Sequence, residues 1–403
     1  MKKNISYISK TSMCCACGAC ISICTKKAIT LKKSSVGRFF AAVNSNCINC
    51  GLCLKVCPSH TTEHSFDNFF SLNKLDIAIG KANNTEILLN GQSGGAVTAT
   101  LSALFRTSSI DAALLCNTET GHPYIVTEES QLKHSQKSYY TPVPLLTEVE
   151  KLMPYNSVAI VGLPCHIAGV TNIMRYKQIP IKYKLGLICD RNLCETISSG
   201  ILNYFGIRDQ GNAIIKWRDK TAEGYNYKNA PITVSHTRKG VIGVIPNNVR
   251  HRLKQLFTAP RCLCCPDKLN LCADIVYGDP WNIGNITEEG ESLIIVNTPR
   301  GKEILTLAAK NNTLLLNRNC SKEELDTSQH ISERKDQIKI YTRLLTWRNK
   351  SYPYQPSKYE NCAPLEYLRA LYCVCRFKFM ELLPKVWIER YVIKKITQMI
   401  NKG

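Results

Sequence analysis

The sequences CCACGACISIC at residues 14–24 and CINCGLCLKVC at residues 47–57 decide the fold of the N-terminal part of this chain. Each spaces four cysteines as C-x2-C-x2-C-x3-C, in which three closely spaced thiolates wrap one [4Fe–4S] cluster and the fourth lies on the following helical turn. Gly18 and Gly51 stand where the backbone must pass close to a cluster, because a side chain there would obstruct the approach. The duplicated pattern predicts two iron–sulfur clusters.

The duplication resembles the two-cluster ferredoxins of bacteria, in which the fourth cysteine of each run ligates the other cluster. We therefore assign one cluster to Cys14, Cys17, Cys20 and Cys57, and the other to Cys47, Cys50, Cys53 and Cys24. Pro58 follows the last cysteine as the motif expects, whereas Thr25 takes that place in the first copy. A disulfide framework and paired zinc sites are the alternatives, but zinc prefers separated C-x-x-C hairpins. The pattern predicts a chain that moves electrons.

The composition favours a reducing compartment and a large second module. The chain has 403 residues and 21 cysteines, and its first residues, MKKNISYISK, lack the apolar core of a signal peptide. Many cysteines without an export signal are typical of metal ligands rather than disulfides. The sequence contains no run of 18 uncharged apolar residues, which a membrane-spanning helix would need. We expect a cytoplasmic protein with roughly 340 residues beyond the ferredoxin module, enough for a large catalytic domain or two smaller ones.

The charge is strongly basic and predicts the kind of partner. The formal net charge is +21, and residues 1–60 contain nine Lys or Arg and no Asp or Glu. A basic face around anionic clusters would attract an acidic electron carrier of the ferredoxin or flavodoxin type by long-range steering. Nucleic acid is the alternative partner, but the basic residues are dispersed and lack the interleaved aromatic residues of a stacking surface. We expect no nucleic-acid binding.

From residue 75 onward the pattern becomes α/β. Short apolar runs bounded by Gly, Pro, Asp or Asn predict strands of a covered sheet at residues 76–80, 110–116, 157–162, 183–189, 273–278 and 292–297. Residues 96–106 and 300–311 have helical patterns, and residues 215–250 are typical of a hairpin. Residues 57–73 are polar and aperiodic, as in a linker.

Four further segments carry a resemblance to a known family. They are GQSGGAVTATLSALF (91–105), VAIVGLPCHIAGV (158–170), GLIC (186–189) and APRCLCCPDKLNLCADIVYGDPW (259–281). In this order they resemble the family of coenzyme F-420 hydrogenase/dehydrogenase beta subunits, many members of which carry a fused ferredoxin module. The resemblance implies non-covalent FAD, a third [4Fe–4S] cluster beside it, and a mixed α/β flavin-binding domain that is not a Rossmann fold.

The same resemblance implies ligands for the third cluster. The family pattern matches Cys165, Cys262 and Cys265, and it matches Cys189 less closely. All four lie on loops near predicted strand ends, so their thiolates could converge. Cys189 could instead be a small buried apolar residue, as free cysteines often are. Cys264 and Cys272 are the candidate replacements.

The flavin contacts are predicted from small and polar residues of these segments. Consecutive small residues before a helix free backbone N–H groups for a pyrophosphate, which favours Ser93, Gly94 and Gly95. Ser93 could instead cap that helix. The segment KSYYTP (137–142) resembles a family motif and suggests Ser138 and Tyr139, although Lys137 precedes the serine here. Asp279 follows a strand end, where it could bond the flavin or cap the next turn.

Several other residues receive a structural interpretation. His166 follows Cys165 and could donate a proton near the flavin, but a lone histidine is more often structural. The cysteines without ligand spacing are expected in the core or on the surface: Cys15, Cys116, Cys194, Cys320, Cys362, Cys373 and Cys375.

The C-terminal region has two amphipathic helical patterns. One apolar stripe contains Leu368, Leu371, Tyr372, Cys375, Phe379 and Leu382, and a second contains Trp387, Ile388, Tyr391, Ile396, Met399 and Ile400. Basic residues flank both stripes. Such helices could lie on an anionic membrane surface, although most amphipathic helices dock on their own core.

Together these patterns predict a ferredoxin domain (1–62), a linker (63–74), an oxidoreductase domain that binds a flavin and a [4Fe–4S] cluster (75–330), and a basic helical extension (331–403). We expect an iron–sulfur flavoprotein oxidoreductase in which FAD exchanges hydride with an organic partner, because clusters carry electrons singly whereas hydride chemistry takes pairs. That partner could be the deazaflavin coenzyme or a substrate related to glycan biosynthesis. The alternative is a non-catalytic electron-transfer subunit that docks on a separate enzyme.

Overall fold

Each cysteine run ends in a short helix that begins after a glycine. The computed structural model describes residues 4–208, 210–284, 286–346, 352–356 and 364–401. Gly18 and Gly51 have left-handed backbones, with φ of 91° and 80°, and they precede α2 (Ala19–Ser22) and α3 (Leu52–Lys55). The antiparallel hairpin of β1 (Ile29–Lys33) and β2 (Phe39–Val43) lies between the two runs, and α1 (Ser6–Lys10) precedes them.

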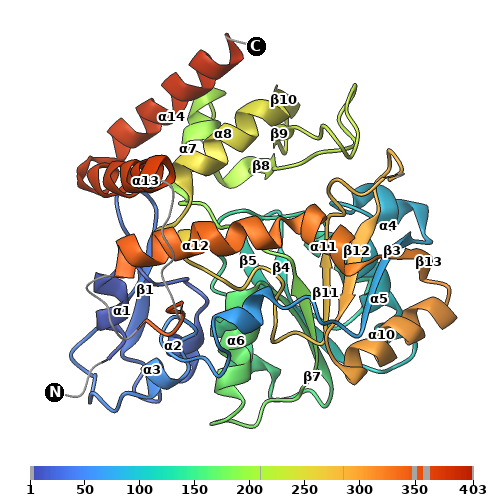
Figure 1. Cartoon of the computed structure of the whole chain (residues 1–403). Coiled ribbons are helices and arrows are strands. Elements are labelled where there is room, and N and C mark those ends of the chain that lie inside the picture. The colour runs from blue at the N-terminus through green and yellow to red at the C-terminus, as the bar shows by residue number, and fades with distance from the viewer. Residues whose placement is uncertain (1–3, 209, 285, 347–351, 357–363, 402–403) are drawn as a thin grey trace.

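A mixed eight-stranded sheet forms the centre of the molecule (Figure 1), in the order β13-β3-β12-β11-β7-β6-β4-β5. Its strands are β3 (Asp76–Ala82), β4 (Ala112–Asn117), β5 (His122–Val126), β6 (Val158–Gly162), β7 (Ile181–Leu187), β11 (Ile275–Gly278), β12 (Ser292–Val296) and β13 (Leu314–Asn319). Strands β4, β6, β7 and β11 run parallel, and antiparallel strands flank them on both sides. The predicted α/β fold class is confirmed.

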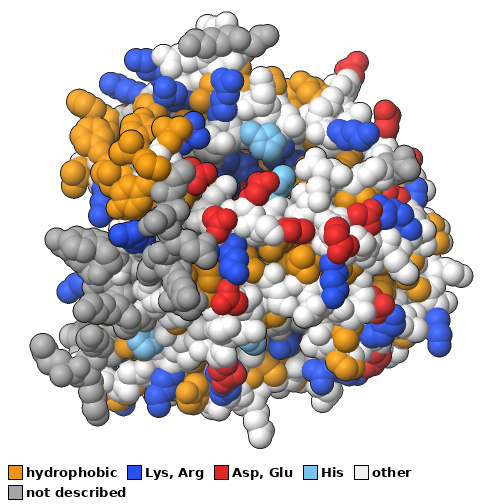
Figure 2. Space-filling model, in the orientation of Figure 1, with side chains coloured by type: hydrophobic (Ala, Val, Ile, Leu, Met, Phe, Trp, Pro, Cys, Tyr) orange, Lys and Arg blue, Asp and Glu red, His pale blue; other side chains and the backbone are white. Residues whose placement is uncertain are grey.

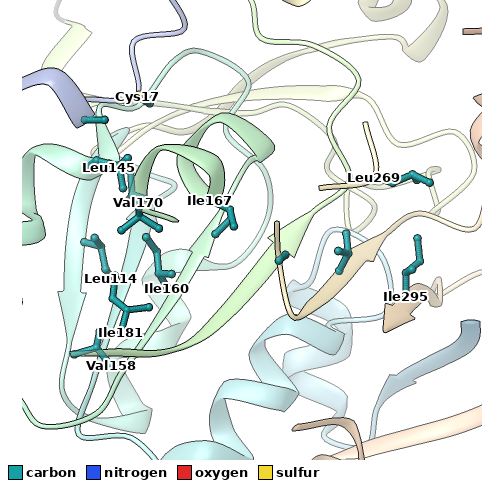
Figure 3. Packing of buried hydrophobic residues seen from close by; sticks show 14 of the residues in the cluster. Cys17, Leu114, Leu145, Val158, Ile160, Ile167, Val170, Ile181, Leu269 and Ile295 are labelled. Atoms are coloured by element: carbon teal, nitrogen blue, oxygen red, sulfur yellow. The ribbon is translucent and has the colours of Figure 1, made fainter. Parts of the chain in front are cut away.

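Helices cover both faces of this sheet and bury its apolar residues. On one face lie α5 (Ala96–Arg106) and α10 (Pro299–Lys310), together with α4 (Thr85–Asn90) and the 3-10 helix η2 (Glu129–Ser135). On the other face lie α6 (Pro164–Ile173) and the 3-10 helix η3 (Leu145–Leu152). Figure 3 shows the second core, where Leu145 and Val170 meet Leu114 and Ile160 of the sheet.

The N-terminal cysteine region shares this second core with the sheet. Cys17, Ala19, Ile23 and Val56 belong to the same buried cluster as the residues of α6 and η3. The backbone N–H of Leu146 donates to the carbonyl oxygen of Cys17 over 2.9 Å. A Cβ at Gly18 would lie 2.8 Å from the backbone nitrogen of Thr147, so glycine is also needed there for this packing. The two regions are therefore one packed body.

A smaller antiparallel sheet forms the upper part of the molecule in Figure 1. Its strands are β8 (Ala213–Lys216), β9 (Ile232–His236) and β10 (Gly240–Ile245). A separate core joins it to α7 (Thr196–Tyr204), α8 (Asn247–Phe257), α13 (Pro364–Leu382) and α14 (Lys385–Ile400). The remaining elements are η1 (Asp67–Phe70), η4 (Gln210–Asn212), α9 (Pro260–Leu263), α11 (Lys322–Gln329) and α12 (Ile331–Thr346).

The segment expected to be a polar linker is anchored by aromatic side chains. Phe66 and Phe69 are buried, and the ring of Phe69 meets that of Tyr354 edge-on at 5.2 Å. The sequence hid these anchors because Phe66, Phe69 and Phe70 span a single turn, which is too short to mark a helix. None of the described helices has the length and apolar character needed to cross a membrane.

Candidate functional site

The first predicted cluster site lies in the interior. Cys17, Cys20 and Cys57 are buried, and Cys14 is half-buried. Burial raises the pKa of the Cys20 thiol, and the nearby thiols of Cys14 and Cys57 raise it further. Burial also raises the pKa of the Cys14 thiol, to about 11. The structure thus places Cys57 of the second run, and also Cys53, near Cys20 of the first run.

The second predicted site lies closer to the surface. Cys50 is exposed, Cys47 is half-buried, and both lie close enough to the buried Cys53 to raise the pKa of its thiol, although its burial contributes more. Backbone N–H groups approach the sulfurs here: Asn49 N lies 3.4 Å from Cys47 Sγ, and Ala28 N lies 3.4 Å from Cys24 Sγ. Such N–H···S bonds stabilise negative charge on thiolates and tune the potential of a bound cluster.

Four cysteines from three segments converge on a third site. Cys165 lies in the first turn of α6, Cys189 follows β7, Cys262 lies in α9, and Cys265 follows α9. All four line one small cavity, which Cys14, Cys15 and Cys194 also line. Burial raises the pKa of the Cys189 thiol, and the thiols of Cys262 and Cys265 raise it further. Cys189 therefore faces other thiols rather than a purely apolar core.

The two replacement cysteines lie elsewhere. The Sγ of Cys264 is fully buried beside the sulfur of Met13, at 3.7 Å, and beside the Arg261 carbonyl oxygen, at 3.5 Å. Cys272 Sγ lies 3.6 Å from His64 Nε2. Neither of them lines the small cavity.

Cys15 connects the first and third groups, although its spacing gave no reason to single it out. Hydrogen bonds from the thiols of Cys165 and Cys17 lower the pKa of Cys15. Cys15 also lines the small cavity. The sequence signal that could have found it is the doublet Cys14–Cys15, because it places a second thiol directly beside a predicted ligand.

A buried arginine supplies positive charge between these thiols. Arg261 is 3 % exposed, and its Nε donates to Ser59 Oγ over 2.8 Å. Its guanidinium lies over the rings of Tyr352 and Tyr354, at 5.5 and 5.0 Å from their centroids. Its Nη1 has no hydrogen-bond partner within the described part of the chain. A buried cation with a free donor suits a neighbouring anionic group.

The donor set fits clusters better than single ions. Among the described residues, no three or more His, Cys, Asp or Glu side chains are placed to hold one metal ion. The four thiolates of a cubane each bind a different iron, so they stand farther apart than the ligands of a single ion. Soft thiolates are also the ligands that iron–sulfur clusters select.

A large cavity of about 790 Å³ opens beside the third cysteine group. Ligand cavities usually measure about 300–1,000 Å³, so it can take a dinucleotide-sized cofactor. The predicted flavin residues Ser93, Gly95, Ser138, Tyr139 and Asp279 line it. Cys189 and Arg334 line both this cavity and the small one, so the two cavities adjoin.

The loop at residues 91–95 differs in detail from its prediction. Gly95, with φ of 70°, is the residue that precedes α5, so Ser93 does not cap that helix. Ser93 Oγ instead lies 3.1 Å from Ser292 Oγ. The N–H of Gly94 donates to the same Ser292 oxygen over 3.1 Å, and Gly94 does not line the cavity. The N–H of Gly94 is therefore engaged by the protein, and the predicted contact from Gly94 to the flavin lacks support.

Lys220, which the sequence did not single out, holds this loop in place. Its side chain is almost fully buried, and its Nζ donates to the carbonyl oxygens of Leu88 and Ser93 over 2.7 and 2.6 Å. It also donates to the carbonyl oxygen of Glu289. These bonds fix Ser93 between two separate segments, which positions the loop at the cavity wall.

The cavity is strongly basic. Among the described residues, only three carboxylates line it, those of Asp190, Asp279 and Glu333. Eight lysines and arginines line it as well: Lys137, Arg191, Arg218, Lys228, Arg250, Lys254, Lys268 and Arg334. A wall with this excess of positive charge suits a ligand that carries phosphate or carboxylate groups.

Arg218 is the most enclosed of these cations. It is 2 % exposed, its Nη1 lies 2.6 Å from Asp279 Oδ2, and its guanidinium lies 4.7 Å from the ring centroid of Trp281. Although burial opposes its charge, Asp279 keeps the pKa of Arg218 above its usual range. Its Nη2 has no geometric hydrogen-bond partner among the described residues. Asp279 therefore pairs with Arg218 and does not cap the following turn.

His166 serves the structure at the rim of the cavity. Its Nδ1 accepts from the N–H of Leu163 over 3.3 Å, and its Nε2 lies 2.9 Å from the carbonyl oxygen of Val143. Burial lowers the pKa of His166 to about 4, so the neutral ring uses both nitrogens in these bonds. This arrangement favours the structural interpretation of His166.

The remaining cysteines differ in their exposure. Cys194 and Cys320 are buried, Cys116 and Cys373 are half-buried, and Cys375 is exposed. Cys362 lies outside the described residues. Burial raises the pKa of the Cys116 thiol, at the cavity wall, to about 12.

Three parts of the chain match models of known protein families. Residues 77–150 match the N-terminal model of the coenzyme F-420 hydrogenase/dehydrogenase beta subunit, residues 155–320 match its C-terminal model, and residues 13–61 match a 4Fe-4S dicluster domain. A subunit of the F(420)H(2) dehydrogenase of Methanosarcina mazei is 26% identical over 310 residues, which cover 72% of this chain and 84% of that protein.

Two further relatives extend the comparison. The coenzyme F-420-dependent sulfite reductase of Methanocaldococcus jannaschii is 26% identical over 239 residues, covering 54% of this chain but only 34% of that protein. A chain of the F-420-reducing [NiFe] hydrogenase complex from Methanosarcina barkeri has a TM-score of 0.53 and 17% identity, and the match covers 71% of this chain and 96% of that one. This structural likeness shows a common fold. The chain therefore belongs to the family of coenzyme F-420 hydrogenase/dehydrogenase beta subunits, which are iron–sulfur oxidoreductase subunits, and it carries a 4Fe-4S dicluster domain at its N-terminal side.

Proposed function

We propose that this chain is an iron–sulfur flavoprotein oxidoreductase, in which the dicluster domain exchanges single electrons with a third cluster and with FAD in the large cavity. The observation that carries the proposal is the shared wall at Cys189, which borders both the thiol-lined cavity and the basic cavity. A group held by Cys189 would stand directly beside a ligand in the large cavity. Cys15 supports electron transfer between the first and third clusters, because it hydrogen-bonds Cys17 of the first group and Cys165 of the third.

The chemistry of the large cavity supports FAD as its ligand. When bound, a flavin accepts electrons singly from clusters and exchanges them in pairs with an organic partner. The excess of lysine and arginine would bind the pyrophosphate, and the free donor of Arg218 is one group that can reach an anionic oxygen. Lys220 would hold the Ser93 loop against the cofactor.

The remaining predicted partners are proposed at the two ends of this path. Cys50 is exposed, so an acidic carrier of the ferredoxin or flavodoxin type would meet the second cluster at the surface, on the basic side of the chain. The organic partner at the flavin would be the deazaflavin coenzyme, which the names of two relatives mention, or a substrate of glycan biosynthesis. The basic wall favours an anionic substrate in either case.

A non-catalytic subunit is the second candidate. The relative from Methanosarcina mazei is a dehydrogenase subunit, and the structural neighbour comes from a multi-subunit hydrogenase complex. In that case this chain would pass electrons to an enzyme that binds separately. The catalytic proposal expects turnover by the isolated chain, whereas the subunit proposal expects turnover only after a partner is added.

Cofactor content tests the proposal directly. Protein purified without oxygen should contain about 12 iron and 12 acid-labile sulfide per chain, because each cubane holds four of each. It should also release one FAD on heating. A value near 8 irons would mean that the third site holds no cluster. Stoichiometric zinc, or protein that takes up no flavin on reconstitution, would contradict the proposal.

A further inference from the structure

The helix α13 carries apolar side chains on two opposite sides. One side packs on the protein through Ala370, Val374, Phe377 and Met380, which are all buried. The other side contains Leu365, Leu368, Tyr372, Cys375, Phe379 and Leu382, which follow one another at intervals of three or four residues and are exposed. Residues at these intervals share one face of a helix. We call this second set the outer face.

The outer face continues onto the start of α14. Val386 and Trp387 are exposed by 50 % and 61 %, and Leu382, just before the turn between the helices, is exposed by 82 %. Figure 2 shows the apolar side chains gathered over this end of the molecule, with basic side chains around them. Single exposed apolar residues are ordinary, but a contiguous patch of this kind usually marks an interaction surface.

The charge around the outer face is positive. Residues 364–401 contain seven Lys or Arg and three Asp or Glu. Two of the three acidic side chains are engaged within the protein: Glu381 bonds Arg38 over 2.7 Å, and Glu389 pairs with Lys385 over 3.5 Å. Lys378, Arg390 and Lys394 remain exposed. The surface is thus an apolar strip with cations beside it.

Neighbouring segments extend this basic character. The hairpin of β1 and β2 lies against α13, where Ser35 Oγ donates to the carbonyl oxygen of Glu381 over 2.9 Å. That hairpin belongs to the region of residues 1–60, which has nine basic residues and no acidic one. The end of the molecule that presents the outer face therefore has little negative charge to oppose an anionic partner.

Both helices are fixed before any partner binds. Ile388, Val392 and Ile396 of α14 are buried in the core of the small sheet, and a Cβ at Gly200 of α7 would lie 2.6 Å from Val392 Cβ. Arg376 Nη2 donates to the carbonyl oxygen of Gln255 over 3.2 Å. The outer face is therefore presented on a preformed support, and no ordering of the helices would oppose binding.

We infer that the outer face and its cations bind the surface of an anionic lipid bilayer. Leucine, phenylalanine and tryptophan side chains insert at the boundary between head groups and acyl chains, while lysine and arginine reach the acidic head groups. The described helices are unsuited to spanning, so the contact is peripheral. This inference is independent of the proposed redox function. A protein partner would need carboxylates placed to meet these cations, whereas an anionic bilayer supplies negative charge everywhere.

Vesicle sedimentation with the intact holoprotein tests the inference. We expect the protein to pellet with vesicles that contain phosphatidylglycerol and phosphatidylcholine, and to bind at least about tenfold more weakly to phosphatidylcholine alone, because each basic side chain near an anionic surface adds roughly a fivefold gain. The triple variant Leu368→Gln, Tyr372→Gln, Phe379→Gln should reduce binding at least about tenfold through lost apolar insertion. Reversing Lys378, Arg390 and Lys394 to glutamate should abolish it.

Matched controls separate the surface from general effects. Met153→Gln changes a side chain that is 57 % exposed but lies directly after η3, outside the outer face, and it should leave vesicle binding unchanged. The variants should retain wild-type iron content and thermal midpoint. Failure of the wild-type protein to pellet with anionic vesicles would overturn the inference. So would a wild-type dimer in sedimentation equilibrium that the triple variant converts to monomer, because a second copy would then occupy the outer face.

Discussion

In RCLCCPD (261–267), Cys262 and Cys265 line the small cavity whereas Cys264 does not, and this distinguishes ligand from bystander. Cys265→Ser should lose about four irons per chain, because serine replaces a soft thiolate at the third cluster. Cys264→Ser should keep all irons, because its sulfur lies beside Met13 and a serine hydroxyl there can donate to the Arg261 carbonyl oxygen. Iron analysis and electron paramagnetic resonance of the reduced proteins measure both. The reverse result would show that Cys264 is the ligand.

Arg218 should control flavin affinity through its charge and its fixed position. Arg218→Met removes a cation from the cavity and leaves Asp279 without its partner, so we expect the flavin dissociation constant to rise at least about tenfold. The flavin dissociation constant of Arg218→Lys should lie between those of the wild-type protein and Arg218→Met, because lysine keeps the charge but not the planar contact with Trp281.

The control for this prediction is Arg318→Met. Arg318 pairs with Glu324 over 2.9 Å at the surface, away from the cavity, and such pairs contribute about 0–1 kcal/mol. Fluorescence titration of the flavin-depleted protein gives both constants. Equal affinities in the Arg218→Met and wild-type proteins would remove Arg218 from the flavin site.

At single positions, sequence reasoning found groups defined by spacing and missed groups defined by folding. The eight N-terminal cysteines repeat a fixed interval, so their grouping can be read without a structure. Cys15 and Lys220 belong to no repeated spacing in the sequence. Their partners, Cys165 for Cys15 and Ser93 for Lys220, come close only when the chain folds. The two interpretations of Asp279 could not be separated either, since its partner Arg218 lies 61 residues away.

Among the structural elements, the loop before α5 gives the sharpest prediction. Gly95 has φ of 70°, and a Cβ there would lie 2.7 Å from the carbonyl oxygen of Ile87. Gly95→Ala should therefore displace the loop and lower both flavin content and the thermal midpoint. Gly240→Ala tests the backbone strain alone, because Gly240 has φ of 71° but nothing within 4 Å of its Cβ.

The two alanine variants share a backbone penalty of roughly 1 kcal/mol, so their difference isolates the clash. Gly240→Ala should keep wild-type flavin content, and Gly95→Ala should not. Absorbance of the bound flavin and a thermal melt measure these effects. Wild-type flavin content in Gly95→Ala would show that this loop does not contact the cofactor.

The sequence predicted the inner elements better than the outer ones. Continuous apolar runs mark the buried strands β3, β4, β6, β7, β11 and β12, and α5 spans residues 96–106 as expected. The edge strand β13 was missed because five of its six residues are exposed and its apolar run, Leu314–Leu316, is only three residues long. Strand β5 contains Pro123 and has only one buried residue. Strand β13 also takes its pairing from β3, which is distant in sequence, whereas β5 pairs with the adjacent β4.

At the scale of the whole molecule, the important feature is the core that the cysteine region shares with the sheet. Cys17 and Val56 are buried together with Leu145 and Ile160. Composition and motif boundaries suggested separate domains, because local patterns do not report which surfaces meet. The amphipathic stripe of α14 does dock on the protein through Ile388 and Ile396, as most such helices do, whereas α13 keeps one apolar face outward.

This shared core has a consequence for the rate of electron flow within the chain. A carrier domain on a flexible linker must move between its two docking sites, so its rate of electron transfer falls as the viscosity of the solvent rises. Here Leu146 bonds Cys17 directly, so the distance between the first and third cysteine groups is fixed by packing. After a laser pulse reduces the second cluster, oxidation of that cluster by the flavin should keep the same rate constant in water and in concentrated glycerol. Delivery of electrons from an external carrier should slow in proportion to viscosity, because that step alone requires diffusion.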